Sequence, residues 1–274
     1  MTTSAWNPLA PFILLWRHRD LLRQFTRRTI EQRHRGSFLG FVWTILTPLL
    51  SLALYTFVFG HVLGTRYGVV PDETRFEYAL GLFLGLAIFQ FIGEILAQAS
   101  TAIVTQPNFV KKVVFPLEVL PVAIVGAAAF NAAVSLTLAI TGIAVLGRGL
   151  DAHALLLLAI LPPVALIGLG CAWFLAALGV FVRDVANAMP FLVQVLVYTS
   201  FVFFPLSLVQ GTVWWTVLRW NPLLHAVDGA RHAVLWQMPV NAHGLLYLWL
   251  SGLAVCFAGY FFFSKTRSAF ADVL

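Results

Sequence analysis

Residues 36–60 read GSFLGFVWTILTPLLSLALYTFVFG, a stretch of 25 residues with no charged side chain. A helix over this stretch rises about 1.5 Å per residue and is therefore long enough to cross a hydrocarbon core of about 30 Å. A basic segment with seven arginines, Arg17 to Arg35, leads directly into it. Because arginines that flank a span stay in the cytoplasm, we expect residues 1–36 to form a cytoplasmic amphipathic interface helix and the span to cross outward.

Composition extends this interpretation to the whole chain. Of its 274 residues, 60% are hydrophobic and only 10% are charged, whereas a soluble domain carries roughly 25% charged residues. This balance indicates an integral membrane protein. Membrane topology accounts for the net charge of +6, so we expect no nucleic-acid partner. The two cysteines, Cys171 and Cys256, lie inside apolar runs, and no histidine stands at ligand spacing from a Cys or Glu, so we predict no metal site.

Apolar runs predict six membrane-spanning helices, over residues 37–60, 78–100, 118–146, 154–181, 187–207 and 243–264. Six crossings place both termini in the cytoplasm, and the cytoplasmic segments then hold 12 of the 17 lysines and arginines, as the positive-inside rule requires. The predicted fold is an all-α membrane protein with an interface helix 1–36, a six-span domain 37–264 and a cytoplasmic tail 265–274. Pro190 and Pro205 interrupt the charge-free stretch after the fourth span, so the fifth span could be followed by short re-entrant helices from the outer surface.

Polar and small residues inside the spans predict a packed bundle. Glu94 lies within the second span, and a carboxylate at that depth is expected to face the bundle interior. We favour a structural or coupling role over a proton relay, because no chain of ionisable residues accompanies it. The spacings Gly36-x-x-x-Gly40 and Gly81-x-x-x-Gly85 place small residues one turn apart, which predicts close approach of neighbouring helices.

Residues 101–118, TAIVTQPNFVKKVVFPLE, form the cytoplasmic connection between the second and third spans. The centre of this segment is too apolar for a solvated loop and predicts docking onto a partner protein or the membrane surface. Residues 259–266, GYFFFSKT, come near the phosphate-binding loop pattern, but Ser264 stands where that loop needs Gly and the segment ends a membrane helix. We therefore expect no nucleotide site in this chain, and any energy-driven function must draw on a partner.

Three motifs resemble a known family. The first is Arg28-x-Ile30-x-x-Arg33-x-Arg35-Gly36-Ser37-x-Leu39-Gly40-x-x-Trp43, followed by Leu46-x-Pro48-Leu49. The others are VVFPLEVLP, residues 113–121, and Asn221-Pro222-Leu223 with Asp228 and Arg231. Together with the chain length and the number of spans, these motifs resemble the type-2 ABC exporter permeases that export polysaccharides such as O-antigen, capsule and teichoic acid.

The resemblance implies a homodimeric permease of the bacterial inner membrane, driven by two separate ABC subunits that bind ATP and Mg²⁺. This chain would then be no enzyme itself. The segment 101–118 would couple to the ATPase through a short helix and its neighbours: Asn108, Phe109, Val110, Lys111, Lys112 and Val113. The segment 205–240 would form short outer helices that gate the exit, with five candidate gate residues: Trp214, Trp215, Asn221, Asp228 and Arg231.

The substrate that the resemblance implies is a lipid-linked polysaccharide such as O-antigen. Its pyrophosphate could bind four arginines of the interface helix: Arg27, Arg28, Arg33 and Arg35. These arginines could instead bind anionic lipid headgroups, anchor the topology or contact the ATPase. Aromatic rings stack on the apolar faces of sugar rings. Six aromatic residues are therefore candidates for the lining of a glycan channel: Trp43, Tyr55, Phe89, Tyr198, Phe201 and Phe204.

Three alternatives remain open on sequence alone. A permease for a drug or another small hydrophobe would share the fold and differ in the N-terminal signature. A membrane enzyme acting on polyprenyl-linked sugars would need acidic residues at a membrane face, where only Glu94, Glu118 and Asp184 are placed. The third is a channel or structural membrane protein without energy input, which activity dependent on ATP and a partner would exclude.

Overall fold

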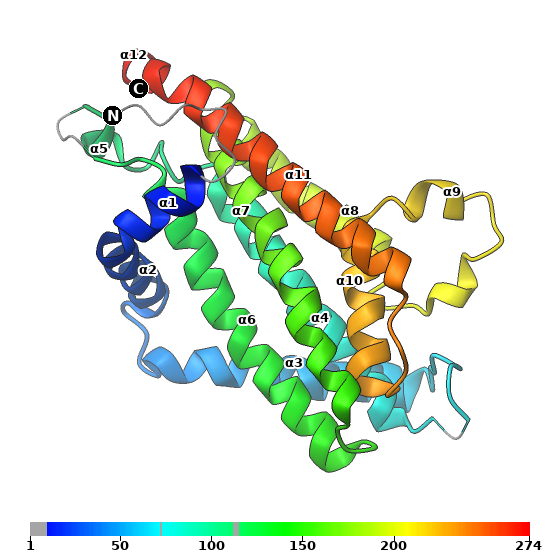
Figure 1. Ribbon diagram of the computed structural model, residues 1–274. Coiled ribbons are helices and arrows are strands. Elements are labelled where there is room, and N and C mark those ends of the chain that lie inside the picture. Colours follow the sequence, from blue (N-terminus) through cyan, green and yellow to red (C-terminus); the bar gives the residue numbers. More distant parts are fainter. Residues whose placement is uncertain (1–9, 72, 112–114) are drawn as a thin grey trace.

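The computed structural model describes residues 10–71, 73–111 and 115–274 (Figure 1). In these residues the chain forms helices and loops and no strand, which confirms the all-α prediction. The helices are α1 (Ala10–Arg17), α2 (Arg19–His34), α3 (Trp43–Tyr55), α4 (Arg75–Ala99), α5 (Pro107–Lys111), α6 (Val119–Leu146), α7 (Leu157–Phe181), α8 (Val185–Thr199), α9 (Trp215–Leu218), α10 (Pro222–Ala230), α11 (Ala242–Thr266) and α12 (Phe270–Val273). Short 3₁₀ or π-helical turns extend or join them: Gly40–Val42, Thr56–Val62, Ala152–Leu156, Leu206–Leu208, Arg231–Leu235 and Arg267–Ala269.

Five helical segments of the described chain are long and apolar enough to cross a membrane: Gly40–Val62, Arg75–Ala99, Val119–Leu146, Ala152–Phe181 and Ala242–Val273. They coincide with five of the six predicted spans. The predicted span 187–207 differs, because α8 ends at Thr199 after 15 residues, which is about 22 Å of helix against a core of about 30 Å. A turn follows it, in which Phe201 has a positive φ of +53°.

Helix α4 is the centre of the bundle (Figure 1). In its most apolar window 89% of the residues are buried, and it packs against α3, α6, α7, α8 and α10. A helix that is apolar all round is stable only where other elements cover every face. The second predicted span is therefore the core around which the other helices are arranged.

Glycine lets α7 and α11 pack closely side by side (Figure 1). A Cβ atom built on Gly259 would lie 2.0 Å from the carbonyl oxygen of Gly170, and one built on Gly170 would lie 2.2 Å from the carbonyl oxygen of Val255. Any larger residue would force the two backbones apart, so the contact depends on glycine at both positions.

The two predicted glycine pairs have different structural roles. A Cβ on Gly81 would lie 2.5 Å from Leu235, and one on Gly85 would lie 2.9 Å from Arg231, so this pair admits a neighbouring segment, as expected. The packing prediction is wrong for Gly36 and Gly40 within this chain, because a Cβ on either would meet no atom within 4 Å. Both have a positive φ, +85° and +49°, and they form the turn between α2 and the first span.

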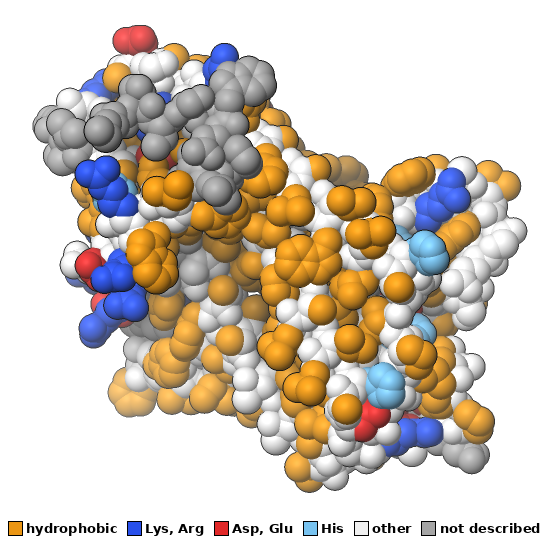
Figure 2. All heavy atoms as spheres, in the orientation of Figure 1, with side chains coloured by type: hydrophobic (Ala, Val, Ile, Leu, Met, Phe, Trp, Pro, Cys, Tyr) orange, Lys and Arg blue, Asp and Glu red, His pale blue; other side chains and the backbone are white. Residues whose placement is uncertain are grey.

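Apolar side chains also cover much of the surface. In the segment Gly40–Val62 only 6% of the residues in the most apolar window are buried. Figure 2 shows hydrophobic side chains across the broad middle of one face, with charged side chains gathered toward its edges. We call the end that carries α1, α5 and α12 the α5 end, and the opposite end, with the loops after α6 and α10, the α10 end (Figure 1).

Candidate functional site

At the α5 end, three phenylalanine rings join the short helix α5 to α2. The ring centroid of Phe25 in α2 lies 5.5 Å from that of Phe109 in α5 and 5.2 Å from that of Phe115. The centroids of Phe109 and Phe115 are 4.6 Å apart. Aromatic pairs of this kind contribute about 0.5–1.5 kcal/mol each beyond the area they bury. Aromatic packing therefore attaches α5 to α2 of the same chain.

The predicted ATPase-coupling residues fall into three groups. Phe109 and Val110 are half-buried; Val110 packs against the core, and Phe109 packs on Phe25 and Phe115. Asn108 and Lys111 are exposed. The remaining two, Lys112 and Val113, lie outside the described residues. The described surface that α5 offers to a partner is thus polar and basic.

Helix α2 is joined to the core by an ion pair. Arg33 of α2 pairs with Glu94 of α4, and their side chains are 24% and 19% exposed. Asn131 of α6 donates from Nδ2 to Glu94 Oε2 at 3.1 Å. The carboxylate inside the second span therefore has a cation and an amide donor as partners, which agrees with the expectation for an ionised group at this depth.

The other three arginines predicted at the interface lie on the surface of α2 or just after it. Arg27 donates to Glu31 at 2.7 Å in an exposed pair one turn apart. Arg28 and Arg35 are exposed. Beside Arg28 lies a cavity of about 210 Å³ between α2, the end of α4 and the start of α6, with six further polar residues on its walls: Thr29, Gln32, Gln98, Thr101, Thr105 and Gln106.

The C-terminal segment is fixed to the start of α6. Arg267 forms an ion pair with Glu118, whose side chain is 1% exposed. Trp173 of α7 donates its indole N–H to the backbone carbonyl of Glu118 at 3.3 Å. Glu118 thus connects the helix that follows the α5 loop with the tail and with α7. A partner that moves α5 would act on a segment anchored on both sides.

The six aromatic residues predicted to line a glycan channel divide by exposure. Trp43, Tyr198 and Phe204 are exposed, and Tyr55 is half-buried. Phe89 and Phe201 lie in the interior, with only 4% and 9% of their surface exposed. Neither of these two presents a ring face to a ligand in this chain.

Phe203 joins two of the predicted aromatic residues. Its ring centroid lies 6.3 Å from that of Tyr55 and 5.7 Å from that of Tyr198. Its backbone carbonyl accepts a hydrogen bond of 2.6 Å from the hydroxyl of Tyr78 in α4. Tyr55 and Tyr198, from the first span and from α8, are therefore neighbours through a residue that sequence analysis missed.

At the α10 end, Arg231 is enclosed by backbone carbonyl groups. It is 2% exposed and donates to Gly81 O at 3.0 Å, to Phe201 O at 2.9 Å and to Val202 O. Its guanidinium also lies 4.5 Å above the ring of Tyr67. Phe201 and Val202 follow the C-terminus of α8, where the helix dipole favours a cation. The cation is thus stabilised by neutral dipoles and an aromatic face.

Asn221 connects the end of α8 with the start of α10. Its Oδ1 accepts from Leu223 N at 3.0 Å and caps the first turn of α10, with Pro222 at the first helical position. Its Nδ2 donates to the hydroxyl of Ser200 at 3.1 Å. The Asn-Pro-Leu motif is therefore a helix start that is fixed to the preceding helix.

Asp228 and Trp215, two further predicted gate residues, lie on the wall of one cavity, whereas Trp214 is exposed outside it. Burial raises the pKa of the Asp228 carboxyl above its ordinary value, an effect that the charges of His232, Arg231 and His225 partly offset. A partly buried carboxyl on a cavity wall, with a histidine as its nearest charged partner at 3.5 Å, is a candidate ligand-binding group.

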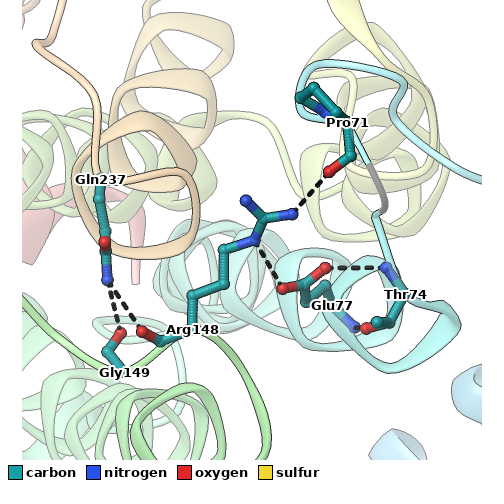
Figure 3. A network of polar contacts seen from close by, with 6 residues as sticks. All are labelled: Pro71, Thr74, Glu77, Arg148, Gly149 and Gln237. Atoms are coloured by element: carbon teal, nitrogen blue, oxygen red, sulfur yellow. Dashed lines mark hydrogen bonds and ion pairs between the residues drawn. The ribbon is translucent and has the colours of Figure 1, made fainter.

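Figure 3 shows a polar network that connects three loops at the α10 end. Thr74 and Glu77 form a reciprocal capping box that begins α4. The second carboxylate oxygen of Glu77 accepts from Arg148 Nε at 2.9 Å, and Arg148 also donates to Pro71 O at 2.8 Å. Gln237 donates to Gly149 O at 3.1 Å. The loops before α4, after α6 and before α11 are thus tied together.

Most of these partners are not predictable from the sequence. The spacing of Thr74 and Glu77 is a capping-box signal that could have been recognised. No local signal pairs Glu77 with Arg148 or Glu118 with Arg267, because the residues of each pair are 71 and 149 positions apart in the sequence.

Comparisons with known proteins find one matching family and relatives that align over most of this chain. The model of a family described as ABC-2 type transporter matches residues 20–235. The O-antigen export system permease protein RfbA of Myxococcus xanthus is 27% identical over 263 residues, covering 94% of this chain and 96% of that protein. RfbA of Klebsiella pneumoniae is 22% identical over 260 residues, with 93% and 95% covered. The polysialic acid transport protein KpsM of Escherichia coli is 25% identical over 234 residues, with 85% and 88% covered.

Proposed function

Because the chain belongs to the ABC-2 type transporter family, we propose that it is the permease subunit of an ATP-driven exporter that moves a lipid-linked polysaccharide across the bacterial inner membrane. One observation carries this proposal. The chain is similar, over nearly its whole length, to proteins named as O-antigen export permeases and to a polysialic acid transport protein. No comparable observation favours a drug permease, a membrane enzyme or a passive channel.

In this proposal the α5 end faces the cytoplasm. The basic helix α2, the exposed Lys111 and the C-terminal Arg267 all lie there, as the positive-inside rule requires. Five long helices cross the membrane, and α8 with the loop that follows it makes a sixth, shorter crossing that keeps both termini in the cytoplasm. The short helices α9 and α10 then lie on the outer side as re-entrant gate helices. The chain divides into an interface segment 1–36, a six-span domain 37–264 and a tail 265–274.

The energy comes from two copies of a separate ATPase subunit that binds ATP and Mg²⁺. A cleft in each ATPase subunit binds α5 of one permease chain and contacts its exposed residues Asn108 and Lys111. Movement of α5 passes to α2 through the ring contacts of Phe25 and Phe109. It then passes to the core through the ion pair of Arg33 with Glu94. The cytoplasmic arginines Arg27, Arg28, Arg33 and Arg35 serve the ATPase contact, the lipid surface or the pyrophosphate of the substrate.

A second copy of the chain completes the glycan path. The sparsely covered first span and α8 carry the exposed Trp43, Tyr198 and Phe204, with Tyr55 beside them. We place these four residues on the path, where ring faces can stack on sugars while the polymer slides. Phe89 and Phe201 belong to the interior instead. The gate residues Asn221 and Arg231 hold the outer helices in position.

Deletion of the gene tests this function. Surface polysaccharide and extracted lipid-linked glycan are measured in the deletion strain and in the same strain with the gene restored. We expect glycan to disappear from the surface and to accumulate inside, with both changes reversed on restoration. Normal surface glycan without internal accumulation would overturn the proposal and direct attention to small hydrophobic substrates.

A further inference from the structure

A cavity of about 560 Å³ opens at the α10 end, between α10, the start of α11 and the arch of residues 205–215. We propose that it is a binding site for one neutral sugar unit of the exported glycan on the outer side of the membrane. This inference rests on the proposed function for the origin of the sugar. The volume of the cavity lies within the range of about 300–1,000 Å³ found for small-molecule sites.

Polar groups with free hydrogen-bonding capacity line the cavity. His225 Nε2 lies 2.8 Å from Arg219 O, so it must donate there, because a carbonyl oxygen only accepts. Its Nδ1 is then a free acceptor. Residue 244 is glycine, and a Cβ there would lie 3.1 Å from that nitrogen. A larger side chain at position 244 would narrow the approach to Nδ1.

Asp228 of α10 and His232 of the turn that follows it also have unused hydrogen-bonding capacity. His232 Nδ1 donates to the backbone carbonyl of Asp228 at 3.0 Å and lies 3.5 Å from its Oδ2. The Asp228 carboxylate thus keeps acceptor capacity, and His232 Nε2 is an acceptor in the neutral ring. Asn241 uses Oδ1 to cap α11, which leaves its Nδ2 as a donor. Carboxylate, imidazole and amide groups together can accept from and donate to neighbouring sugar hydroxyls.

Two tryptophans supply the apolar part of the site. Trp236 is 7% exposed, and its indole N–H is buried without an acceptor among the described residues. The ring of Trp236 belongs to the lining, while its indole N–H is shielded from solvent. Trp215 is half-buried in the same lining and offers ring surface to the C–H face of a sugar.

The charge of the lining selects the class of ligand. Among the described residues that line the cavity there is no lysine or arginine, and Asp228 is the one carboxylate. Arg231 is adjacent in sequence to His232 of the lining, but its N–H groups donate to the carbonyls of Gly81, Phe201 and Val202 and not into the cavity. A phosphate or a pyrophosphate would meet the Asp228 carboxylate and no lysine or arginine, so only the two histidines of the lining, when protonated, could bind it. A neutral polyol with an apolar face fits both the hydroxyl partners and the tryptophans.

Saturation-transfer NMR on the full chain in lipid nanodiscs tests the site. The probes are the methyl glycosides of glucose, galactose, mannose and rhamnose. A site that releases a sliding polymer holds each sugar unit weakly, and saturation transfer detects weak binding. We expect transfer to at least one glycoside, and roughly three- to tenfold weaker binding in Trp215→Ala and Asp228→Asn. The matched controls are Trp220→Ala and Asp151→Asn, which remove an exposed ring and an exposed carboxylate outside the cavity. They are expected to bind as the unaltered chain does.

Three results would overturn the site: no transfer to the unaltered chain, equal loss in the controls, or displacement of the glycoside by equimolar inorganic phosphate. The gene deletion described above separates this inference from the proposed function. Lost surface glycan without glycoside binding removes the site alone. Glycoside binding with normal surface glycan removes the export function and leaves a sugar site.

Discussion

Arg33 in α2 and Glu94 in α4 form an ion pair, and Asn131 in α6 donates to the same carboxylate. One contact therefore joins the helix that precedes the first span to two helices of the core. Since both charged side chains are mostly shielded from water, loss of either leaves the other with an unfavourable charge.

The variant Glu94→Gln is expected to lower the free energy of unfolding by about 1–3 kcal/mol. The double variant with Arg33→Gln is expected to cost less than the two single changes together, because neither charge is then left alone. Thermal unfolding of the four proteins in nanodiscs measures this cycle. Arg27→Gln, in the exposed pair with Glu31, serves as the control and should change stability by less than about 0.5 kcal/mol. Additive effects of Arg33 and Glu94 would argue against the pair.

Charge reversal at the exposed face of α5 is expected to impair coupling. Lys111→Glu replaces a cation at a polar contact by an anion, which costs about 1–2 kcal/mol and corresponds to a roughly tenfold loss of permease-stimulated ATP hydrolysis. The measurement is ATPase activity of the complex reconstituted with its partner subunit, alongside the amount of permease inserted. Lys265→Glu, also at an exposed position, is the control. Full stimulation by the Lys111 variant would exclude a coupling role for this residue.

Substitution of Arg231 is expected to loosen the α10 end. The planar guanidinium of Arg231 directs three nitrogen atoms to three carbonyls, those of Gly81, Phe201 and Val202. The single ammonium group of lysine in Arg231→Lys cannot reach all three. We expect a loss of about 2–4 kcal/mol in the free energy of unfolding and faster hydrogen exchange at the end of α8. Arg219→Lys, at an exposed arginine stacked on Trp220, is the matched control. Equal thermal stability of the two variants would contradict the role given to the carbonyls.

Loss of an exposed ring on α8 is expected to slow export. Tyr198→Ala removes a surface aromatic that packs against Phe203, and one stacking contact is worth about 0.5–1.5 kcal/mol. The rate of appearance of surface glycan should fall roughly two- to tenfold, while basal ATP hydrolysis is unchanged. Phe174→Ala removes an exposed ring from α7 and should leave export unaltered. An unchanged rate with Tyr198→Ala would remove this residue from the glycan path.

Long apolar runs made most of the fold predictable. The predicted spans 78–100, 118–146 and 243–264 agree within a few residues with α4, α6 and α11. The end of α8 at Thr199 was not predictable to the residue, because Pro205, the break signal in this charge-free stretch, lies beyond the residue at which the helix ends. Phe201 in the turn after α8 has a positive φ, and Arg231, which is distant in sequence, donates to its carbonyl.

The candidate sites were predictable as segments and not as contacts. Glu94 was expected to face inward, but its partner Arg33 was assigned to the interface helix on charge alone. Arg231 was counted as an external cation and is instead enclosed. In both cases the deciding interaction joins residues that only the packing of α2, α4 and α10 brings together. No periodicity or spacing encodes such a pair.

The carbonyl surroundings of Arg231 also determine how the α10 end responds to its medium. A guanidinium remains protonated at any physiological acidity, and amide carbonyls have no proton to gain. A junction made with a carboxylate would open as the pH fell through the pKa of that carboxylate, and at the surface it would weaken with added salt. Arg231 is 2% exposed and binds neutral oxygens, so its hydrogen bonds between α4, the end of α8 and the segment after α10 do not themselves titrate. On the proposed outer side, where acidity and salt follow the environment of the cell, these bonds keep their donors and acceptors, and pH acts on this region through Asp228, whose carboxyl feels the charge of Arg231.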